Sequence, residues 1–204
     1  MEAGLDPDMV IERWDKAAKV HFDRRVLQEL ASLRFVEAHR NVVLLGPVGV
    51  GKTFLANALG HLACRAGFRV RIHRADALLR LLRQSRLDNS RDALMTELCT
   101  VDVLILDDFA LEPMTRDESR DVYQLFVERT ARASTIVTSN RDTSDWLAVF
   151  DDTLLAQSAM NRAATSMAHS CETPPTGRGA RLLKGASCVR RSDVSACFRS
   201  AVSS

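Results

Sequence analysis

The chain has 204 residues, of which 46% are hydrophobic and 26% charged, and its formal net charge at pH 7 is +2. This length predicts one domain, and the composition is that of a globular protein that buries a core, which excludes full disorder. No apolar run approaches the ~18 residues of a membrane span, and the acidic start is unlike a secretory signal. Five cysteines without a CxxC pair indicate a reducing cytoplasm, and the small net charge does not indicate a nucleic-acid binder.

The composition changes after residue 162. Residues 163–204 contain eight Ser, three of the five Cys, no Ile, and six Lys or Arg against two Asp or Glu, so the first 162 residues carry a net charge of −2. Such a segment buries too little apolar area to offset the entropy of ordering, and we predict a disordered, solvated tail. A DNA-binding tail is the alternative for its arginines. A zinc site from His169 and the three cysteines is disfavoured because the ligand spacing is wrong.

Residues 1–162 alternate between strand and helix patterns. Because such alternation is typical of a parallel sheet covered on both faces, we predict an α/β fold with three layers. The expected strands are Val42–Leu45, Arg69–His73, Val101–Leu106 and Ser134–Thr138. The expected helices are Val20–Phe35, Thr53–Ala66, Asp76–Leu87 with Asp76 as its cap, Arg91–Thr100, Asp117–Ala133 and Leu147–Asn161, the last interrupted near Asp151 and Asp152.

A phosphate-binding loop follows the first expected strand. The segment Gly46-Pro47-Val48-Gly49-Val50-Gly51-Lys52-Thr53 fits the pattern G-x-x-x-x-G-K-[ST] and opens a helix, as this motif requires. Its glycines let successive backbone N–H groups point at phosphate oxygens, and the helix start adds its positive dipole end. Lys52 supplies a charge to the β- and γ-phosphates, and Thr53 offers a hydroxyl to Mg²⁺. The sequence therefore predicts a site for ATP with Mg²⁺.

Polar residues also end two later strands. Asp107 and Asp108 follow a strongly apolar strand, where an acidic residue of a P-loop ATPase holds Mg²⁺ through water. We predict that Asp107 serves the metal and that Asp108 is the base that polarises the attacking water. Asn140 follows the next strand, and its amide can donate to the γ-phosphate and accept from water.

With these strands placed, the sequence resembles the ATP-binding helper proteins of insertion sequences, the IstB family, close kin of the bacterial helicase loader DnaC. The resemblance covers roughly residues 4–162. Beyond the phosphate loop, it is carried by Leu104-Ile105-Leu106-Asp107-Asp108-Phe109, Glu118-Ser119-Arg120-Asp121-Val122-Tyr123, Thr135-Ile136-Val137-Thr138-Ser139-Asn140-Arg141, Asp145-Trp146-Leu147 and Leu154-Leu155-Ala156-Gln157-Ser158-Ala159-Met160-Asn161-Arg162.

The resemblance implies an AAA+ core with strand order 5-1-4-3-2 and an ATPase that acts on DNA as a homo-oligomer, helping a transposase to engage its target. By position, Arg162 would be the arginine finger that reaches the γ-phosphate of a neighbouring subunit, which makes hydrolysis depend on assembly.

The sequence departs from the family at both ends. The family has a longer helical domain before its core, so residues 1–40 are interpreted as a truncated helical remnant before an ATP-binding core at 41–162. After Arg162 the family continues with a last strand and a tail reading Tyr-Arg-Pro-Arg. Codons can be chosen for residues 175–179 that, when read one nucleotide earlier, encode Tyr-Arg-Pro-Arg. This match suggests a change of reading frame. We therefore predict that the fifth strand is missing, that Val42–Leu45 is an exposed edge, and that the protein is marginally stable.

The function predicted is that of an ATP-binding and hydrolysing helper of transposition. Three alternatives remain open: a DnaC-like helicase loader in DNA replication, a small-molecule kinase with a P-loop, and a non-functional truncated remnant. A loader needs a partner-binding N-terminal segment, and a kinase needs a lid and an acceptor pocket. ATP turnover with and without duplex DNA would discriminate among them.

Overall fold

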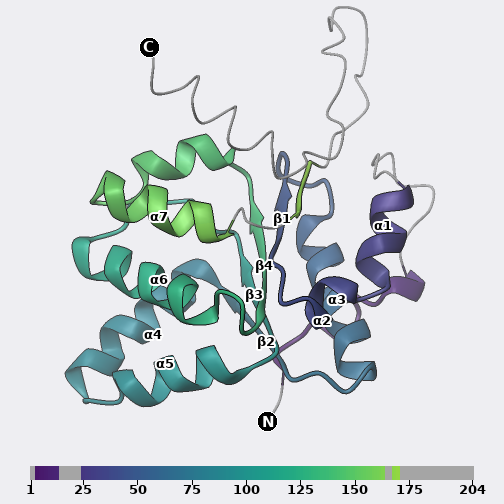
Figure 1. The fold of residues 1–204 in the computed structure, drawn as a ribbon, viewed down its shortest axis with the longest axis horizontal. Helices are drawn as coiled ribbons and strands as arrows, with labels where there is room; N and C mark the ends of the chain where they lie inside the picture. The colour runs from purple at the N-terminus through teal and green to yellow at the C-terminus, as the bar shows by residue number, and fades with distance from the viewer. Residues whose placement is uncertain (1–2, 14–23, 164–166, 171–204) are drawn as a thin grey trace, which may run out of the picture.

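A five-stranded parallel sheet forms the centre of the protein, with strand order β2-β3-β4-β1-β5 (Figure 1). The computed structural model describes residues 3–13, 24–163 and 167–170. The α/β fold and the expected order 5-1-4-3-2 are confirmed, because the observed order is the same one read from the other edge. The strands are β1 (Val42–Leu45), β2 (Val70–Arg74), β3 (Val103–Asp107), β4 (Ser134–Ser139) and β5 (Met167–Ser170).

The prediction of a missing fifth strand is wrong. β5 pairs with β1 in parallel, with Val42 opposite Met167 and Leu45 opposite Ser170, so β1 has a neighbour on each side. The composition argument failed because it averaged over 42 residues, whereas a four-residue strand needs only backbone N–H and C=O groups to pair. The marginal stability predicted from an exposed β1 loses its basis. The rest of the predicted tail, including the three cysteines of the disfavoured zinc site, lies outside the described residues.

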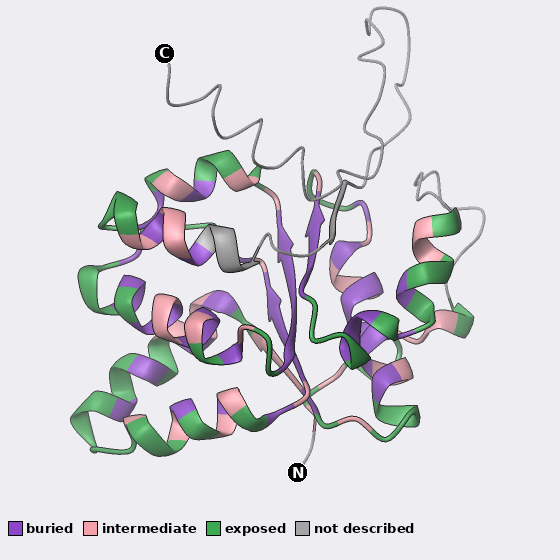
Figure 2. Ribbon diagram, in the orientation of Figure 1, coloured by how far each residue is buried: buried purple, intermediate pink, exposed green. Residues whose placement is uncertain are grey.

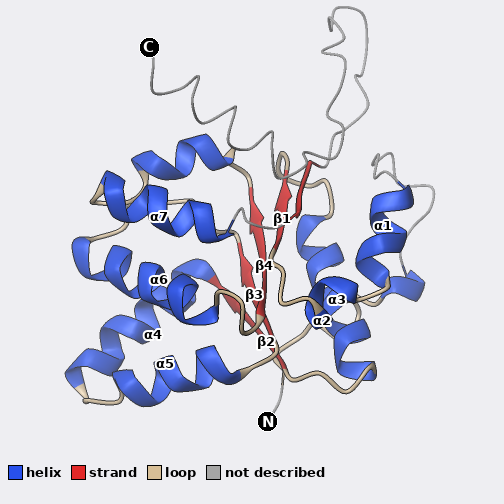
Figure 3. Ribbon diagram, viewed as in Figure 1, coloured by secondary structure: helices blue, strands red, loops and turns tan. Residues whose placement is uncertain are grey.

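Helices cover both faces of the sheet and complete the three layers (Figure 3). Among the described residues, one layer contains three α-helices and the other contains four, and two short 3-10 helices are also present. The first layer comprises α1 (Arg24–Ala31), α2 (Arg34–Glu37) and α3 (Lys52–Arg65), with the 3-10 helix η1 (Ile11–Arg13) against α3. The second comprises α4 (Ala75–Leu87), α5 (Arg91–Thr100), α6 (Arg116–Arg129) and α7 (Thr153–Ala163), with the 3-10 helix η2 (Thr143–Ala148).

The central strands are buried on both faces, which explains why they are continuous apolar runs (Figure 2). Side chains of β1 alternate between two cores: Val43 and Leu45 pack toward the α4–α7 layer, and Val42 and Leu44 pack toward α3. Because β1 is packed on both faces, its carboxyl end, from which the loop to α3 begins, is held in place.

Several helix boundaries differ from the expectations. The helix expected over Leu147–Asn161 is divided near the expected interruption, because a 3-10 helix ends at Ala148 and α7 begins at Thr153. Asp76 is not a cap: Arg74 occupies that position, and the Asp76 carboxylate pairs with Arg74 and Arg80. The helix expected to run to Ala133 ends at Arg129, because Ala131 adopts a left-handed backbone with φ of 61°. The helix expected over Val20–Phe35 is divided where Leu33 has φ of 56°, and its first four residues lie outside the described ranges.

Within the described part of the chain, no helix combines the length and apolar character needed to cross a membrane.

Candidate nucleotide site

The segment Gly46–Thr53 begins directly after β1, and its last two residues, Lys52 and Thr53, are the first two of α3. Gly49 has φ of 84° and Gly51 has φ of 86°, a left-handed backbone that side chains with a Cβ disfavour. α3 begins at Lys52, so the N–H groups of its first turn have no partner within the helix and lie beside the loop. A curled loop next to a helix N-terminus is suited to phosphate oxygens.

Lys52 links the loop to the sheet. Its side chain is buried, and its Nζ donates to the carbonyl oxygens of Gly46 at 2.8 Å and Pro47 at 2.7 Å. The same Nζ donates to Oδ1 of Asn140 at 2.6 Å. The ammonium therefore lies between the loop and the residue that follows β4.

Asp107, the last residue of β3, lies beside the start of α3. Its Oδ1 accepts hydrogen bonds from Oγ1 of Thr53 at 2.9 Å and from Oγ1 of Thr138 at 2.7 Å. Among the described residues, no hydrogen bond reaches Oδ2. Because Thr53 uses its proton on Asp107, the lone pairs of its hydroxyl and the free Oδ2 are available to a hard cation. These oxygen donors fit Mg²⁺, which prefers few protein ligands and keeps waters.

Asp108 begins a sharp turn after β3. Its φ is 54°, in the left-handed region, and its backbone N–H donates to Oγ1 of Thr138 at 2.9 Å. The next N–H, of Phe109, donates to the carbonyl of Thr138 at 2.8 Å. The turn places the Asp108 side chain at the rim of a cavity of about 270 Å³.

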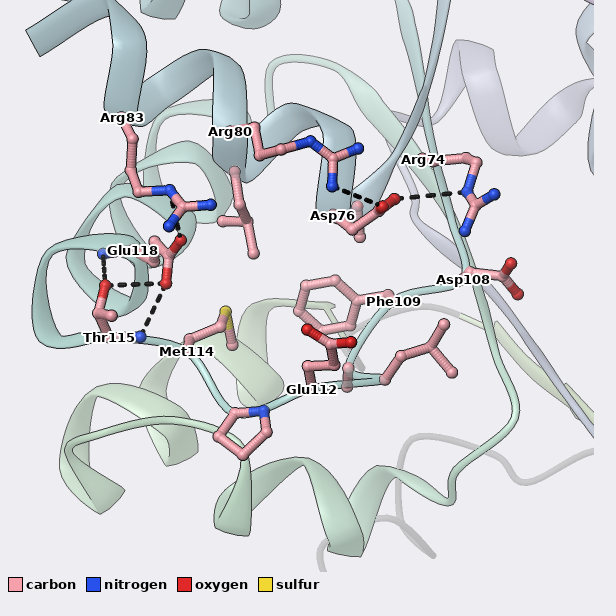
Figure 4. Close-up of a pocket in the computed structure, with 15 residues that line it drawn as sticks. Arg74, Asp76, Arg80, Arg83, Asp108, Phe109, Glu112, Met114, Thr115 and Glu118 are labelled. Atoms are coloured by element: carbon pink, nitrogen blue, oxygen red, sulfur yellow. Dashed lines mark hydrogen bonds and ion pairs between the residues drawn. The ribbon is translucent and has the colours of Figure 1, made fainter.

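This cavity lies between α4, α6 and the loop that follows Asp108 (Figure 4). Its arginines are paired with carboxylates: Arg80 lies 3.0 Å and Arg74 lies 3.4 Å from Asp76, and Arg83 lies 3.3 Å from Glu118. The charges offset one another, so the cavity offers no excess of positive charge to an anion.

The structure thus brings Lys52, Thr53, Asp107 and Asn140 together through hydrogen bonds and places Asp108 next to them. Arg162 lies in the last turn of α7, and its side chain is outside the described part of the structure. Its predicted role as an arginine finger stays a prediction.

Two hydroxyls that the sequence analysis did not single out complete the site. Thr138 contacts the turn at Asp108 as described above. Ser139 Oγ donates to the carbonyl of Phe109 at 2.8 Å and accepts from Nε1 of Trp146 at 3.2 Å. The available signal was the pair of hydroxyl residues that directly follows the apolar pair Ile136 and Val137 at the end of the expected strand, because buried polar groups need partners.

A sequence model of the family described as IstB-like ATP binding protein matches residues 2–184. The chain belongs to this family. The match to the IstB-like family extends past Arg162 and includes β5.

Relatives of this chain are named for insertion sequences. It is 41% identical over 152 residues to a protein of Pseudomonas aeruginosa named as an ATP-binding protein of insertion sequence IS21, covering 74% of this chain and 57% of the relative. It is 34% identical over 161 residues to a Mycobacterium tuberculosis protein named as an ATP-binding protein in an insertion sequence, covering 78% and 64%. The chain thus spans about three fifths of the length of these relatives.

Solved structures share the fold. A DNA replication initiation factor superposes with a TM-score of 0.69 at 20% identity, covering 83% of this chain and 51% of that one. DnaI gives a TM-score of 0.67 at 22% identity, covering 83% and 95%. The DnaC helicase loader gives 0.61 at 19% identity, covering 74% and 94%. At these identities the likeness shows the fold alone.

Proposed function

We propose that this IstB-family chain binds ATP with Mg²⁺ at the carboxyl edge of its sheet and hydrolyses it. The observation that carries the proposal is the convergence of Lys52, Thr53, Asp107 and Asn140, which come from three separate segments, on one point beside a glycine-rich loop. The family's description as ATP-binding supports the same conclusion.

Each residue has a distinct task in this proposal. The loop N–H groups and the start of α3 hold the phosphates, and Lys52 exchanges its carbonyl contacts for the β- and γ-phosphates. Thr53 and Asp107 would hold Mg²⁺, which would neutralise charge that develops on the phosphates. Asp108 accepts a proton from the attacking water, and Asn140 orients that water against the γ-phosphate.

The cellular role that we propose is that of a helper of insertion-sequence transposition, acting on DNA with a transposase. The names of the relatives from Pseudomonas aeruginosa and Mycobacterium tuberculosis support this context. We further propose that copies of the chain assemble, with Arg162 of one subunit reaching the γ-phosphate of the next. A helicase loader is the alternative, and its support is the shared fold with DnaC at 19% identity.

The test is ATP turnover by the purified chain, measured with and without duplex DNA. We expect turnover that requires Mg²⁺, is lost in Lys52→Ala, and rises when DNA promotes assembly. Absence of Mg²⁺-dependent turnover in the parent chain would reject the ATPase proposal. Parent-like turnover in Lys52→Ala would reject this site assignment.

DNA binding has its own test. Because the net charge of the chain is low, we expect it to bind DNA weakly through the DNA phosphates. Such binding should not depend on the DNA sequence and should weaken as the salt concentration rises. Fluorescence anisotropy with a labelled duplex at about 50 and 200 mM salt measures this dependence. Affinity that does not change with salt would contradict a phosphate-directed mode.

A further inference from the structure

One hydroxyl contacts both carboxylate residues of the candidate site. Oγ1 of Thr138 donates to Oδ1 of Asp107 at 2.7 Å and accepts from the backbone N–H of Asp108 at 2.9 Å. From this geometry we infer that Thr138 is a positioning residue, which sets the carboxylate of the metal residue and the turn of the base residue together. The inference rests on the proposed ATPase function.

The first contact selects which oxygen of Asp107 faces the metal. Thr138 and Thr53 both donate to Oδ1, from opposite neighbours β4 and α3. With Oδ1 held from two sides, the carboxylate cannot rotate freely, and Oδ2 stays open. Without Thr138 the carboxylate would retain one donor and could turn about its Cβ–Cγ bond, so that its free oxygen would no longer have a fixed direction.

The second contact holds a backbone conformation that would otherwise be unfavourable. Asp108 has φ of 54°, and Ala110, two residues later, has φ of 62°. Left-handed residues other than glycine persist where surrounding contacts fix them, and such residues concentrate at functional sites. Thr138 provides two of those contacts, because its hydroxyl accepts from Asp108 and its carbonyl accepts from Phe109.

Thr138 is suited to this task because it does not itself move. It is fully buried in β4, and its main chain pairs with Leu44 of β1 in the centre of the sheet. A β-branched side chain in a strand has restricted χ1 freedom, which fixes the direction of the hydroxyl. The hydroxyl has one proton and two lone pairs, and the contacts with Asp107 and Asp108 use the proton and one lone pair.

The experiment replaces the hydroxyl while keeping the shape, with Thr138→Val. Thr138→Ser restores the hydroxyl without the methyl group. Thr135→Val is a matched control, because it is the same substitution on the same strand at a buried residue whose hydroxyl accepts from Nε of Arg129 at 3.1 Å, away from the site. Turnover is measured against ATP and Mg²⁺ concentration, and binding of a non-hydrolysable ATP analogue is measured with Mg²⁺ and with EDTA.

We expect Thr138→Val to bind the analogue in EDTA as the parent does, because the phosphate loop and Lys52 are intact. Its kcat should fall about tenfold or more, and half-maximal turnover should need about tenfold more Mg²⁺, as for a lost hydrogen bond to a charged group. Thr138→Ser should restore both values to within a few-fold, and Thr135→Val should leave both unchanged.

The outcomes separate this inference from the function on which it rests. A parent chain without Mg²⁺-dependent turnover overturns both. An active parent with parent-like kcat and Mg²⁺ dependence in Thr138→Val overturns the inference alone. If Thr138→Val does not fold, Thr138→Ala is the second hydroxyl-free variant. Loss of folding in both, with Thr135→Val folded, would make the hydroxyl structural and would also overturn the inference.

Discussion

Lys52 and Asn140 are 88 residues apart in sequence, yet Nζ of Lys52 donates to Oδ1 of Asn140 at 2.6 Å. This bond joins the start of α3 to the end of β4 across the point where phosphates would enter. The ammonium has three protons, and the carbonyls of Gly46 and Pro47 take the others. Binding of a phosphate chain must therefore exchange some of these contacts, which couples Asn140 to the occupancy of the loop.

The first prediction concerns Lys52→Ala. Removing the ammonium should weaken ATP binding by about 10- to 100-fold, because a charged hydrogen bond to phosphate is lost. Calorimetry with ATP and Mg²⁺ measures the change. Arg65→Ala is the control, since Arg65 is the cation in the last turn of the same helix and pairs with Glu12 on the surface. Equal affinities for Lys52→Ala and the parent would show that the phosphates bind elsewhere.

The second prediction concerns Asp108→Asn. The amide keeps the size of the side chain and cannot accept the proton, so kcat should fall by about 10²- to 10⁴-fold while ATP affinity is retained. Steady-state turnover and analogue binding measure the two quantities separately. Glu112→Gln is the matched control, because Glu112 lines the same cavity from the same loop and should be neutral. Unchanged kcat in Asp108→Asn would move the base to another residue.

Much of the fold was predictable from the chain alone. β1 was expected at Val42–Leu45 and is observed there, because a four-residue apolar run before a glycine has few other interpretations. α5 was likewise expected over Arg91–Thr100, with the same bounds. The grouping of Lys52 with Asn140 followed from strand order, since the carboxyl ends of parallel strands share one edge of a sheet.

Other features depended on tertiary context. The cap of α6 is a capping box between Thr115 and Glu118, whose S/T-x-x-E spacing is visible in the sequence, yet the helix was expected to begin later. β5 could not be predicted from composition, because its pairing uses the backbone of β1. The contacts of Thr138 depend on the left-handed turn at Asp108, and the sequence alone does not show which backbone groups such a turn brings to Thr138.

The third prediction concerns Arg129, a buried arginine at the end of α6. Its guanidinium donates to the carbonyls of Leu98 at 2.6 Å and Val101 at 3.0 Å, and also to the carbonyl of Ser134. Burial lowers the pKa of Arg129 to about 10, which still leaves it charged at neutral pH. It joins α5, α6 and β4, so Arg129→Met should leave these carbonyls unpaired and lower the free energy of unfolding by about 3 kcal/mol.

Urea denaturation at pH 7 measures this loss. Arg132→Met is the matched control, because Arg132 lies three residues later and its exposed side chain forms an i,i+4 ion pair with Glu128 at 3.5 Å. Its substitution should change the free energy of unfolding by less than about 0.5 kcal/mol. If both substitutions changed the free energy of unfolding equally, Arg129 would not stabilise the packing of α5, α6 and β4.

The fourth prediction concerns the packing of the N-terminal residues 3–8 against α3. The N–H of Asp6 donates to Oδ1 of Asn57 at 3.0 Å, and Leu5 packs against Gly60. A Cβ at Gly60 would lie 2.7 Å from Cδ2 of Leu5 and 2.9 Å from Cδ1 of Ile105, closer than real Cβ contacts. Alanine favours a helix over glycine by ~1 kcal/mol, but overpacking costs about 1–3 kcal/mol, so we expect Gly60→Ala to be destabilising.

A double-mutant cycle with Leu5→Ala distinguishes the contribution of Leu5 to the cost of Gly60→Ala from the contribution of the core residue Ile105. If Leu5 is the main obstacle, Gly60→Ala should cost about 1 kcal/mol less in the Leu5→Ala background than in the parent, because the truncated side chain leaves room for the new methyl group. Urea denaturation of the four proteins gives the coupling energy. The clash with Ile105 remains in both backgrounds, so it cancels from the comparison. Equal costs of Gly60→Ala in the two backgrounds would show that Leu5 does not oppose a methyl group at position 60.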